Sequence, residues 1–324
     1  MKKLFLILLI APVFGFGQGE QRYADGTATD QDGNTFEWIN YGTQDWAIEN
    51  AEVLTYRDGT PIPQVTDATE WSNLTTGAWC YYDNDSTKGK LYNWYAVKGI
   101  HDNDENTPNK EFAPNGWHVP SDAEWTTLEE YLIANGYNYD GTTTGNKIAK
   151  AVASTTGWNS STNTGAIGND QSLNNKSGFN AFPEGYRDYY GQFKRDGLGT
   201  YYLSSTEYNS DKALWRTPYY VNSHLSRNSG NKRDGYSLRF VRDASTATTK
   251  DYSDAITIYP NPTTSIINIE QDFTTAKVYD ISGRELLKST SKTIDLSELP
   301  SSIYLLRLYD DSIRVLGTSK VVKQ

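Results

Sequence analysis

Residues 115–125 read NGWHVPSDAEW, and this stretch predicts the clearest helix of the chain. Ser121 is a favourable helix N-cap, and Glu124 three residues later completes a capping box, in which each side chain accepts a hydrogen bond from the backbone of the other residue. Asn135-Gly136 marks the end of the helix, because glycine tolerates the left-handed backbone that is common there. Apolar residues at helical spacing predict that one face packs on a core; they are Trp125, Leu128 and Leu132.

The same stretch contains His118, which raises the question of catalysis. The chain has three histidines, His101, His118 and His224, and no HExxH or CxxC motif. Histidines scattered in this way do not indicate a zinc site, and neither a GxSxG elbow nor a phosphate-binding loop is present. We therefore expect His118 to be a partly buried imidazole that bonds to the backbone. It would lie in a turn that a tryptophan anchors, and this turn would place the helix against the core.

Length and charge limit the classes of partner. The 324 residues suffice for about two domains. The formal charge of −10 would become −12 on removal of a leader that contains Lys2 and Lys3. Binding to nucleic acid requires a basic surface that releases counterions, so we expect no nucleic-acid partner. All nine tryptophans precede residue 216, so the N-terminal and C-terminal parts of the chain differ in composition and are expected to be different kinds of domain.

Residues 1–17, MKKLFLILLIAPVFGFG, have the pattern of a secretory signal peptide. Two lysines precede an apolar run, and Gly15 and Gly17 stand before the expected cleavage site. A membrane anchor is the alternative, but the run is shorter than the ~20 apolar residues that a span requires, and it contains Pro12. No later segment of the sequence could cross a bilayer. We therefore expect a soluble, exported protein without a membrane span.

Residues 244–255, ASTATTKDYSDA, nearly lack aromatic residues and are rich in small polar ones, as is typical of a linker. Beyond it, short β-type runs alternate with turn residues such as Asn261-Pro262. This spacing predicts a small antiparallel β-sandwich over residues 256–324. The expected strands cover residues 256–258, 266–269, 276–279, 294–296, 303–308 and 321–322.

Three blocks and the chain end occur in this region in a characteristic order: IYPNPTTSIINIE, KVYDISGRELL, IDLSELPSSIYLLRLYDD and KVVKQ. They resemble the type A C-terminal sorting domain of the type IX secretion system. Ser302 departs from that family, which usually has glycine there. The resemblance implies an immunoglobulin-like sandwich that the translocon and sorting machinery recognise as a signal for export. The protein would then be secreted or reach the outer-membrane surface of a Gram-negative bacterium. The alternative is an immunoglobulin-like module that stays on the mature protein.

Seven blocks occur in order within residues 24–243: DQDGNTFEWINYGTQDWAIEN, GAWCYYDND, KGKLYNWYAV, APNGWHVPSDAEWTTLEEYL, SGFNAFPEGYR, YYLSSTEY and GYSLRFVRD. Together they resemble the Fibrobacter succinogenes major paralogous domain. HVPSDAEW and GYSLRFVRD are also similar to motifs of formylglycine-generating enzymes, whose fold is C-type-lectin-like. The resemblance implies an α+β, C-type-lectin-like domain with few helices, mostly antiparallel strands and long loops.

The copper chemistry of those enzymes does not carry over. It requires a pair of cysteines late in the domain, whereas Cys80 is the only cysteine of this chain. Phe240 stands where many relatives have cysteine, and Glu184 stands where a small residue is usual. We therefore expect a non-enzymatic protein. The alternative is a divergent formylglycine-generating or glycan-processing enzyme, the latter with paired carboxylates.

Two acidic clusters raise the question of calcium. Asp83 and Asp85 in YYDNDSTKGK, and Asp30 and Asp32 in DQDGN, place carboxylates at alternate positions, as calcium loops do. Neither cluster has the closing glutamate of an EF-hand. Turns in which such side chains bond to their own backbone explain the same residues without a metal. Calcium at Asp83 and Asp85 is the one cofactor to consider.

Aromatic residues surround the first acidic cluster. Exposed rings beside acidic and amide groups can hold sugars, because the ring covers an apolar sugar face while the polar groups bond to hydroxyls. The candidate ligand contacts are therefore Trp79, Tyr81, Tyr82 and Trp94. Large aromatic residues also fill cores, so core packing is the alternative. We expect an exported binding module for carbohydrate or another extracellular polymer, with a structural adhesin as a further alternative.

Overall fold

The computed structural model describes residues 22–244, 256–280, 284–309 and 315–324. They form two compact units, divided between residues 245 and 246. The predicted signal peptide, and all of the predicted linker except its first residue, lie outside the described residues. Strands account for 35% of the structure and helices for 11%, so the fold is rich in β-structure. No helix in the described ranges is long and apolar enough to cross a membrane.

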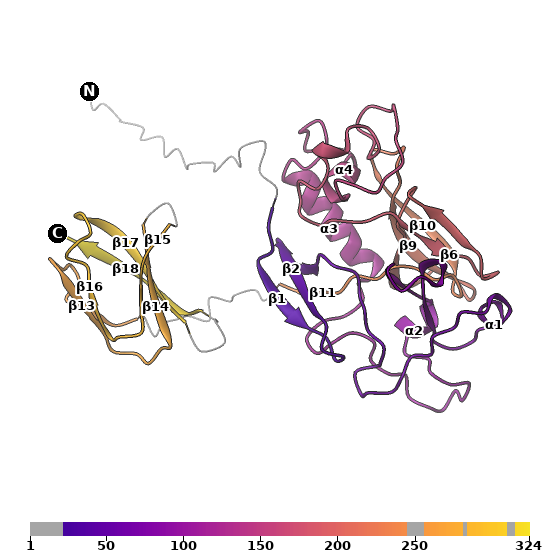
Figure 1. The fold of residues 1–324 in the computed structure, drawn as a ribbon, viewed down its shortest axis with the longest axis horizontal. Coiled ribbons are helices and arrows are strands. Elements are labelled where there is room, and N and C mark those ends of the chain that lie inside the picture. The colour runs from indigo at the N-terminus through magenta and orange to yellow at the C-terminus, as the bar shows by residue number, and fades with distance from the viewer. Residues whose placement is uncertain (1–21, 245–255, 281–283, 310–314) are drawn as a thin grey trace, which may run out of the picture. The chain divides into compact units, whose positions relative to one another are not determined.

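The two ends of the N-terminal unit meet in one sheet. Its strands follow the order β1 (Gly26–Thr29), β2 (Thr35–Tyr41), β3 (Gln44–Ala47) and β11 (Val241–Asp243), and all neighbours are antiparallel. In Figure 1, the last strand of the unit, β11, lies close to β2, which comes from near the start of the unit. Val241 pairs directly with Trp46, whose side chain is fully buried. The loop-rich chain between β3 and β11 is therefore held at both ends.

A second sheet and two hairpins complete the strands of this unit. The sheet has the antiparallel order β10 (Leu225–Asn231), β9 (Lys212–Pro218) and β8 (Tyr202–Glu207). The hairpins pair β4 (Trp79–Tyr81) with β5 (Lys90–Tyr92), and β6 (Glu184–Arg187) with β7 (Phe193–Asp196). The expectation of mostly antiparallel strands joined by long loops is confirmed.

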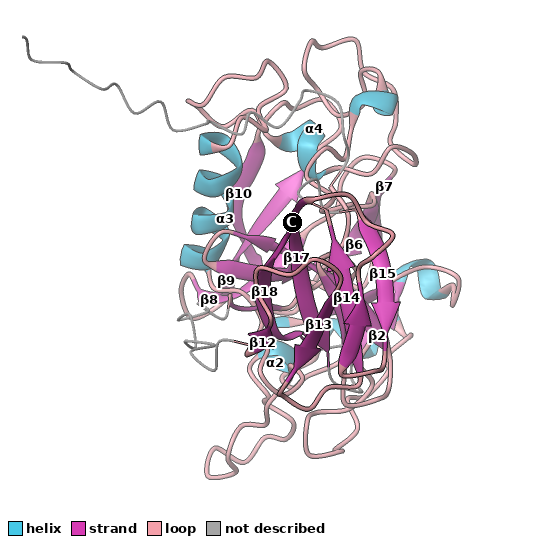
Figure 2. Cartoon of the chain, turned by 90° about the vertical axis from the view of Figure 1, so that its left-hand side faces the viewer, coloured by secondary structure: helices cyan, strands magenta, loops and turns pink. Residues whose placement is uncertain are grey.

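The predicted helix is present as α3 (Asp122–Ala134). Both hydrogen bonds of the capping box form, Asn135 is the C-cap, and Gly136 follows with φ of 76°. The predicted start and end of the helix are thus confirmed. Figure 2 shows that the other helices are short. They are α1 (Ala68–Ser72), α2 (Trp94–Val97), α4 (Ala149–Val152) and the 3-10 turns η1 (Tyr82–Asn84) and η2 (Gln171–Leu173).

The apolar stripe of α3 faces a core, as predicted. Trp125, Leu128 and Leu132 are buried, and the rings of Trp125 and Trp46 lie 4.6 Å apart between centroids. Full burial of side chains of this size stabilises a fold by about 1.5–3 kcal/mol each. This core therefore joins the helix to the first sheet.

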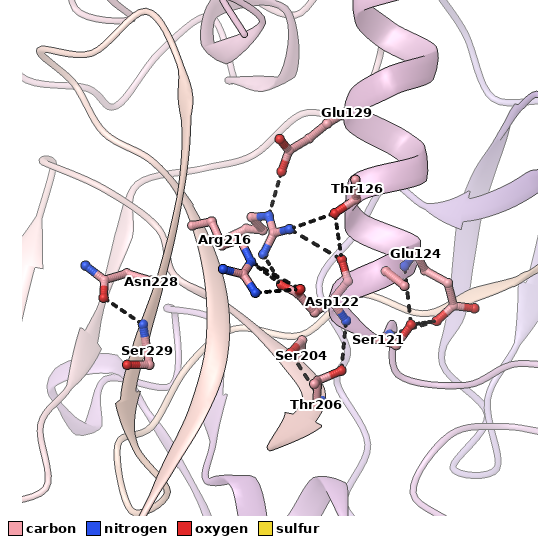
Figure 3. A network of polar contacts seen from close by, with 12 residues as sticks. Ser121, Asp122, Glu124, Thr126, Glu129, Ser204, Thr206, Arg216, Asn228 and Ser229 are labelled. Atoms are coloured by element: carbon pink, nitrogen blue, oxygen red, sulfur yellow. Dashed lines mark hydrogen bonds and ion pairs between the residues drawn. The ribbon is translucent and has the colours of Figure 1, made fainter. Parts of the chain in front are cut away.

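Charged side chains join the other side of α3 to the second sheet (Figure 3). Arg216 of β9 is almost fully buried, and its guanidinium donates to Glu129 Oε1 (2.6 Å), to Thr126 Oγ1 (3.2 Å) and to Asp122. The N–H of Asp122 donates to Thr206 Oγ1 of β8 (3.0 Å). A buried charge is tolerated only when it is paired and hydrogen-bonded. The network therefore fixes the position of the helix on the sheet.

The segment before α3 is attached to the last strand of the unit. The backbone N–H and C=O of His118 bond to Val241 of β11 at 2.8 and 2.9 Å. Trp117 is buried, and its ring meets that of Phe36 edge-on with centroids 5.1 Å apart. The prediction of a tryptophan-anchored turn before a capped helix is confirmed.

The C-terminal unit is an antiparallel β-sandwich. One sheet has the order β12 (Ile258–Tyr259), β13 (Ile266–Ile269) and β16 (Thr293–Asp295), and the other has the order β15 (Glu285–Ser289), β14 (Thr275–Tyr279), β17 (Ser302–Tyr309) and β18 (Val315–Lys323). Ile267 and Ile294 from the first sheet share a core with Val278 and Leu306 from the second. Each predicted run overlaps a strand. β15 was not predicted, because ELLKS lacks β-branched residues and its pairing with β14 decides its conformation.

Candidate functional site

His118 belongs to the helix cap. Its side chain is about half exposed, and Nε2 pairs with the Glu124 carboxylate, so the expected bond to the backbone was wrong. Glu124 Oε2 accepts from both the N–H and the hydroxyl of Ser121 (2.7 and 2.8 Å). Oε1 is therefore left to accept from the imidazole. This hydrogen bond raises the pKa of His118 against the opposing effect of burial.

Three of the four predicted ligand-binding rings are buried. Trp79 and Trp94 are 5% and 6% exposed and belong to one core, and Tyr82 packs with Trp71 in another. Tyr81 is half-buried, and its ring meets that of Trp79 edge-on with centroids 5.1 Å apart. A covered ring offers no open face to a sugar. The buried rings therefore fill cores in this conformation, which is the alternative that the sequence left open.

Two of the carboxylates considered for calcium accept hydrogen bonds from threonine residues. Asp83 and Asp85 are exposed, and Asp85 accepts from the N–H and the hydroxyl of Thr87 (2.9 and 2.8 Å). These two hydrogen bonds lower the pKa of Asp85. In the second cluster, Asp32 accepts from the N–H and the hydroxyl of Thr55 (3.1 and 2.7 Å). Among the residues that the structure describes, no group of three or more His, Cys, Asp or Glu side chains is placed to hold a metal ion.

A polar pocket of about 380 Å³ lies in the N-terminal unit. Its wall comes from five parts of the chain. They are the turn and strand start around β2, the segment after β3, the residue before β5, the segment leading into β6 and the segment before β11. The side chains that define it are Asn50, Glu52, Asn180, Phe182, Glu184 and Arg239. Phe182 is 42% exposed. An aromatic ring beside a few fixed polar groups is a combination found in ligand sites.

Glu184 is fixed in this pocket by two hydrogen bonds. Asn50 Nδ2 donates to one carboxylate oxygen (2.9 Å) and the N–H of Gly89 donates to the other (3.2 Å). Burial raises the pKa of Glu184, and these two hydrogen bonds offset the effect only in part. A Cβ at position 89 would lie 2.3 Å from Glu184 Oε2, so any larger residue there would displace the carboxylate. The carboxylate is therefore held in one place.

Arg239 forms another part of the wall and is only 2% exposed. Its terminal nitrogens donate to the carbonyls of Ala47 and Asn180 (both 3.3 Å) and to the hydroxyl of Tyr202 (3.2 Å). Within the described structure, Arg239 Nε and Asn50 Oδ1 are buried without a hydrogen-bond partner. Such atoms cost about 1–3 kcal/mol each and require an explanation in a native protein. A polar ligand that reorients these side chains would supply the missing partners.

Two of the predicted aromatic residues are connected to the pocket through a lysine. Lys90 of β5 pairs with the carboxylate of Glu52, and its Nζ lies 5.5 Å from the ring centre of Trp79 and 5.2 Å from that of Tyr81. Aromatic faces attract a cation at this range. Trp79 and Tyr81 thus position Lys90, and Lys90 positions Glu52.

The pocket itself does not follow from the sequence. The one signal is Glu184, a carboxylate where the resembled family usually has a small residue. Asn50 and Arg239 carry no signal, because their place in the wall depends on contacts between distant segments. Asn50 and Glu184, for example, are separated by 134 positions.

Comparison with known protein families gives two matches. The model of the Fibrobacter succinogenes major domain matches residues 39–242, which include all six residues that define the pocket. The model of the secretion system C-terminal sorting domain matches residues 257–324. No curated protein and no solved structure matches the chain.

Proposed function

Because the chain belongs to the Fibrobacter succinogenes major domain family and ends in a sorting domain, we propose that its N-terminal unit is a non-enzymatic module that binds an extracellular polysaccharide. The observation that carries the proposal is the polar pocket, with its fixed Glu184 and its open Phe182 ring. A C-type-lectin-like fold, which the sequence resemblance implies, is part of this proposal. The pairing of β3 with β11 at the two ends of the unit supports it.

Export sets the context of this function. The C-terminal sorting domain directs the chain to the cell surface or to secretion in Gram-negative Bacteroidetes, through interaction with the type IX secretion machinery. A protein delivered there meets polymers outside the cell. The ligand of the N-terminal unit is therefore expected among extracellular polymers.

The chemistry of the pocket suits a neutral sugar. The carboxylates of Glu52 and Glu184 accept hydrogen bonds from hydroxyls, and the side chain of Asn180 both donates and accepts. The exposed ring of Phe182 can cover an apolar sugar face. Glu184 is fixed before the ligand arrives, which reduces the entropy lost on binding.

A glycan-processing enzyme is the second candidate, because Glu52 and Glu184 line one pocket and burial raises the pKa of Glu184. A glycosidase needs one carboxyl group as acid and another as base or nucleophile. Here both oxygens of Glu184 accept from protein donors, and Glu52 is paired with Lys90. These contacts hold both carboxylates in place and leave lone pairs that can accept from sugar hydroxyls. A fixed, partnered carboxylate is less suited to transfer a proton, which favours binding over hydrolysis.

An array of neutral oligosaccharides, probed with the full chain, tests the proposal. We expect retention of at least one glycan and about tenfold weaker binding for Phe182→Ala, since one ring contact contributes about 0.5–1.5 kcal/mol. Tyr208→Ala is the matched control, because it removes an exposed ring outside the pocket. Absence of binding to every glycan would contradict the proposal and favour an adhesin. New reducing ends that are lost in Glu184→Gln would indicate an enzyme.

A further inference from the structure

We propose that a second pocket of the N-terminal unit binds a carboxylated sugar, one uronic acid residue in size. The pocket has a volume of about 210 Å³ and lies between the segment that follows α3, helix α4 and the loop through residues 164–176. The side chains that carry the inference are Tyr137, Tyr139, Lys150, Thr164, Leu173 and Lys176. None of them lines the first pocket, so this inference does not depend on the proposed function.

The charge of this pocket points to an anion. Within the described residues, no carboxylate lies within ion-pair distance of Lys150 or Lys176. Lys150 is only 6% exposed, and its ammonium donates to the carbonyls of Ala166 (3.3 Å), Asn169 and Asp170 (3.0 Å). Burial lowers the pKa of Lys150, and the charge of Asp170 opposes this effect. Lys90 and Lys232 are buried to a similar degree, but each is paired with a carboxylate.

The two lysines would act differently on a bound carboxylate. The ammonium of Lys150 has three donors, and three carbonyl oxygens accept from them. Lys150 therefore attracts an anion through its charge. The side chain of Lys176 is exposed. Within the part of the chain that the structure describes, only its backbone carbonyl is hydrogen-bonded, as acceptor from the N–H of Arg22 (3.3 Å). Lys176 is thus able to donate directly to the ligand.

The remaining lining fits a sugar ring. Tyr139 is exposed but held in place, because its ring lies against Gly165, where a Cβ would come within 2.3 Å of the ring. Leu173 adds exposed apolar surface, and Thr164 adds a hydroxyl. Pockets for drug-sized ligands measure about 300–1,000 Å³. This smaller pocket therefore suits a single ring with one charged group.

The first pocket provides a contrast within the same unit. Its lining includes the carboxylates of Asp30, Glu49, Glu52 and Glu184 and one guanidinium, that of Arg239. An anionic sugar would meet a negative surface there and a positive one at Lys150 and Lys176. A carboxylate on the ligand therefore favours binding in the second pocket and disfavours binding in the first.

Calorimetric titration of the full chain with D-glucuronate and with D-glucuronamide tests the inference, since the two differ only in charge. We expect the acid to bind up to about fivefold more tightly than the amide, which is the upper end of the range for one solvent-screened charge contact. Added salt should weaken the binding of the acid. Lys176→Gln should bring it close to that of the amide, with only the contribution of the Lys150 charge remaining, while Lys176→Arg should retain it.

Two controls locate the site. Lys212→Gln removes an exposed lysine that does not line the pocket, and Phe182→Ala alters only the first pocket; both should bind glucuronate as the unaltered chain does. Equal affinity for acid and amide, failure of both to bind, or unchanged binding in Lys176→Gln would each overturn the inference. None of these results bears on neutral glycans at Glu184, so the two proposals fail separately.

Discussion

Arg216 of β9 and Arg227 of β10 are direct partners across the strand pair, and both donate to the carboxylate of Asp122 at the start of α3. Like charges opposite each other on neighbouring strands destabilise a sheet. Asp122 compensates both charges and also complements the positive end of the helix. Burial alone would raise the pKa of Asp122, but the hydrogen bonds from Arg227 and Arg216 lower it. One carboxylate thus joins the helix to the sheet.

Asp122→Asn is therefore expected to destabilise the N-terminal unit strongly. Removal of one partner from a buried ion pair costs about 3–5 kcal/mol. Because Arg216 keeps its bond to Glu129, we expect the lower end of that range. Denaturant unfolding followed by tryptophan fluorescence measures the change, and it reports on this unit alone because all nine tryptophans precede residue 216.

Glu130→Gln is the matched control for that variant. Glu130 lies on the same helix, and its side chain is exposed. Exposed substitutions usually change stability by less than about 0.5 kcal/mol. Equal unfolding midpoints for the two variants would show that Asp122 does not carry the attachment of α3.

The sequence predicts those features that depend on neighbouring residues. Helix α3 has its N-cap, its apolar stripe and its terminal glycine within about four turns, so its start, its end and its buried face could all be predicted. The strands of the C-terminal unit follow from short β-type runs between turns. Its β15 could not be predicted, because the pairing with β14 decides its conformation.

The first pocket could not be predicted from the sequence, because it forms through contacts between distant segments that no local pattern indicates. The sequence left ligand contact and core packing open for Trp79, and the structure places its ring in a core. Glu184 meets Asn50 across 134 positions of sequence, far beyond any local pattern. Turn chemistry at Asp85 was recognised as an alternative to calcium, since its partner Thr87 is two residues away.

Trp117→Ala tests the anchor of the turn before α3. The ring is buried against Phe36, and the guanidinium of Arg242 lies 4.4 Å from its centre. Truncation of a buried tryptophan costs about 3–5 kcal/mol, because it leaves a cavity that the core fills only in part. Thermal unfolding should show a clearly lowered midpoint. Tyr208→Ala, which removes an exposed ring, should leave the midpoint nearly unchanged, and similar midpoints for the two variants would refute the anchor.

The pair of His118 and Glu124 should make stability depend on pH. Because the folded state raises the pKa of His118, the contribution is complete below the unfolded pKa of about 6.5 and is lost as pH rises through the folded pKa. The imidazole is about half exposed, so solvent screening limits the effect to under about 1 kcal/mol. His118→Gln should thus unfold earlier than the unaltered chain at mildly acidic pH and at the same temperature at alkaline pH.

His224→Gln is the control for this pH dependence, because His224 is exposed and lies outside the helix cap. Its melting temperature should follow that of the unaltered chain at every pH. A constant difference between His118→Gln and the unaltered chain across the pH range would mean that the charge of His118 plays no part.

Asp234 should also make stability fall as pH rises, but for a different reason, because burial penalises its charged form. Its carboxylate accepts from the N–H of Tyr189 and the hydroxyl of Tyr236 (both 2.8 Å). Burial nevertheless raises the pKa of Asp234 to about 6, against the opposing effect of these hydrogen bonds. The folded protein therefore binds this proton more tightly than the unfolded chain, whose pKa is about 3.9.

Asp234→Asn should remove a loss of stability that the unaltered chain suffers as pH rises from about 4 to about 6. Two pKa units correspond to roughly 3 kcal/mol. Between about pH 4 and about pH 6, the free energy of unfolding of the variant should therefore rise by up to that amount relative to that of the unaltered chain. Above about pH 6 the difference should stay constant. Denaturant unfolding at several pH values measures the difference. Asp211→Asn, at an exposed carboxylate, should run parallel to the unaltered chain. A parallel curve for Asp234→Asn as well would show that burial does not penalise the Asp234 charge.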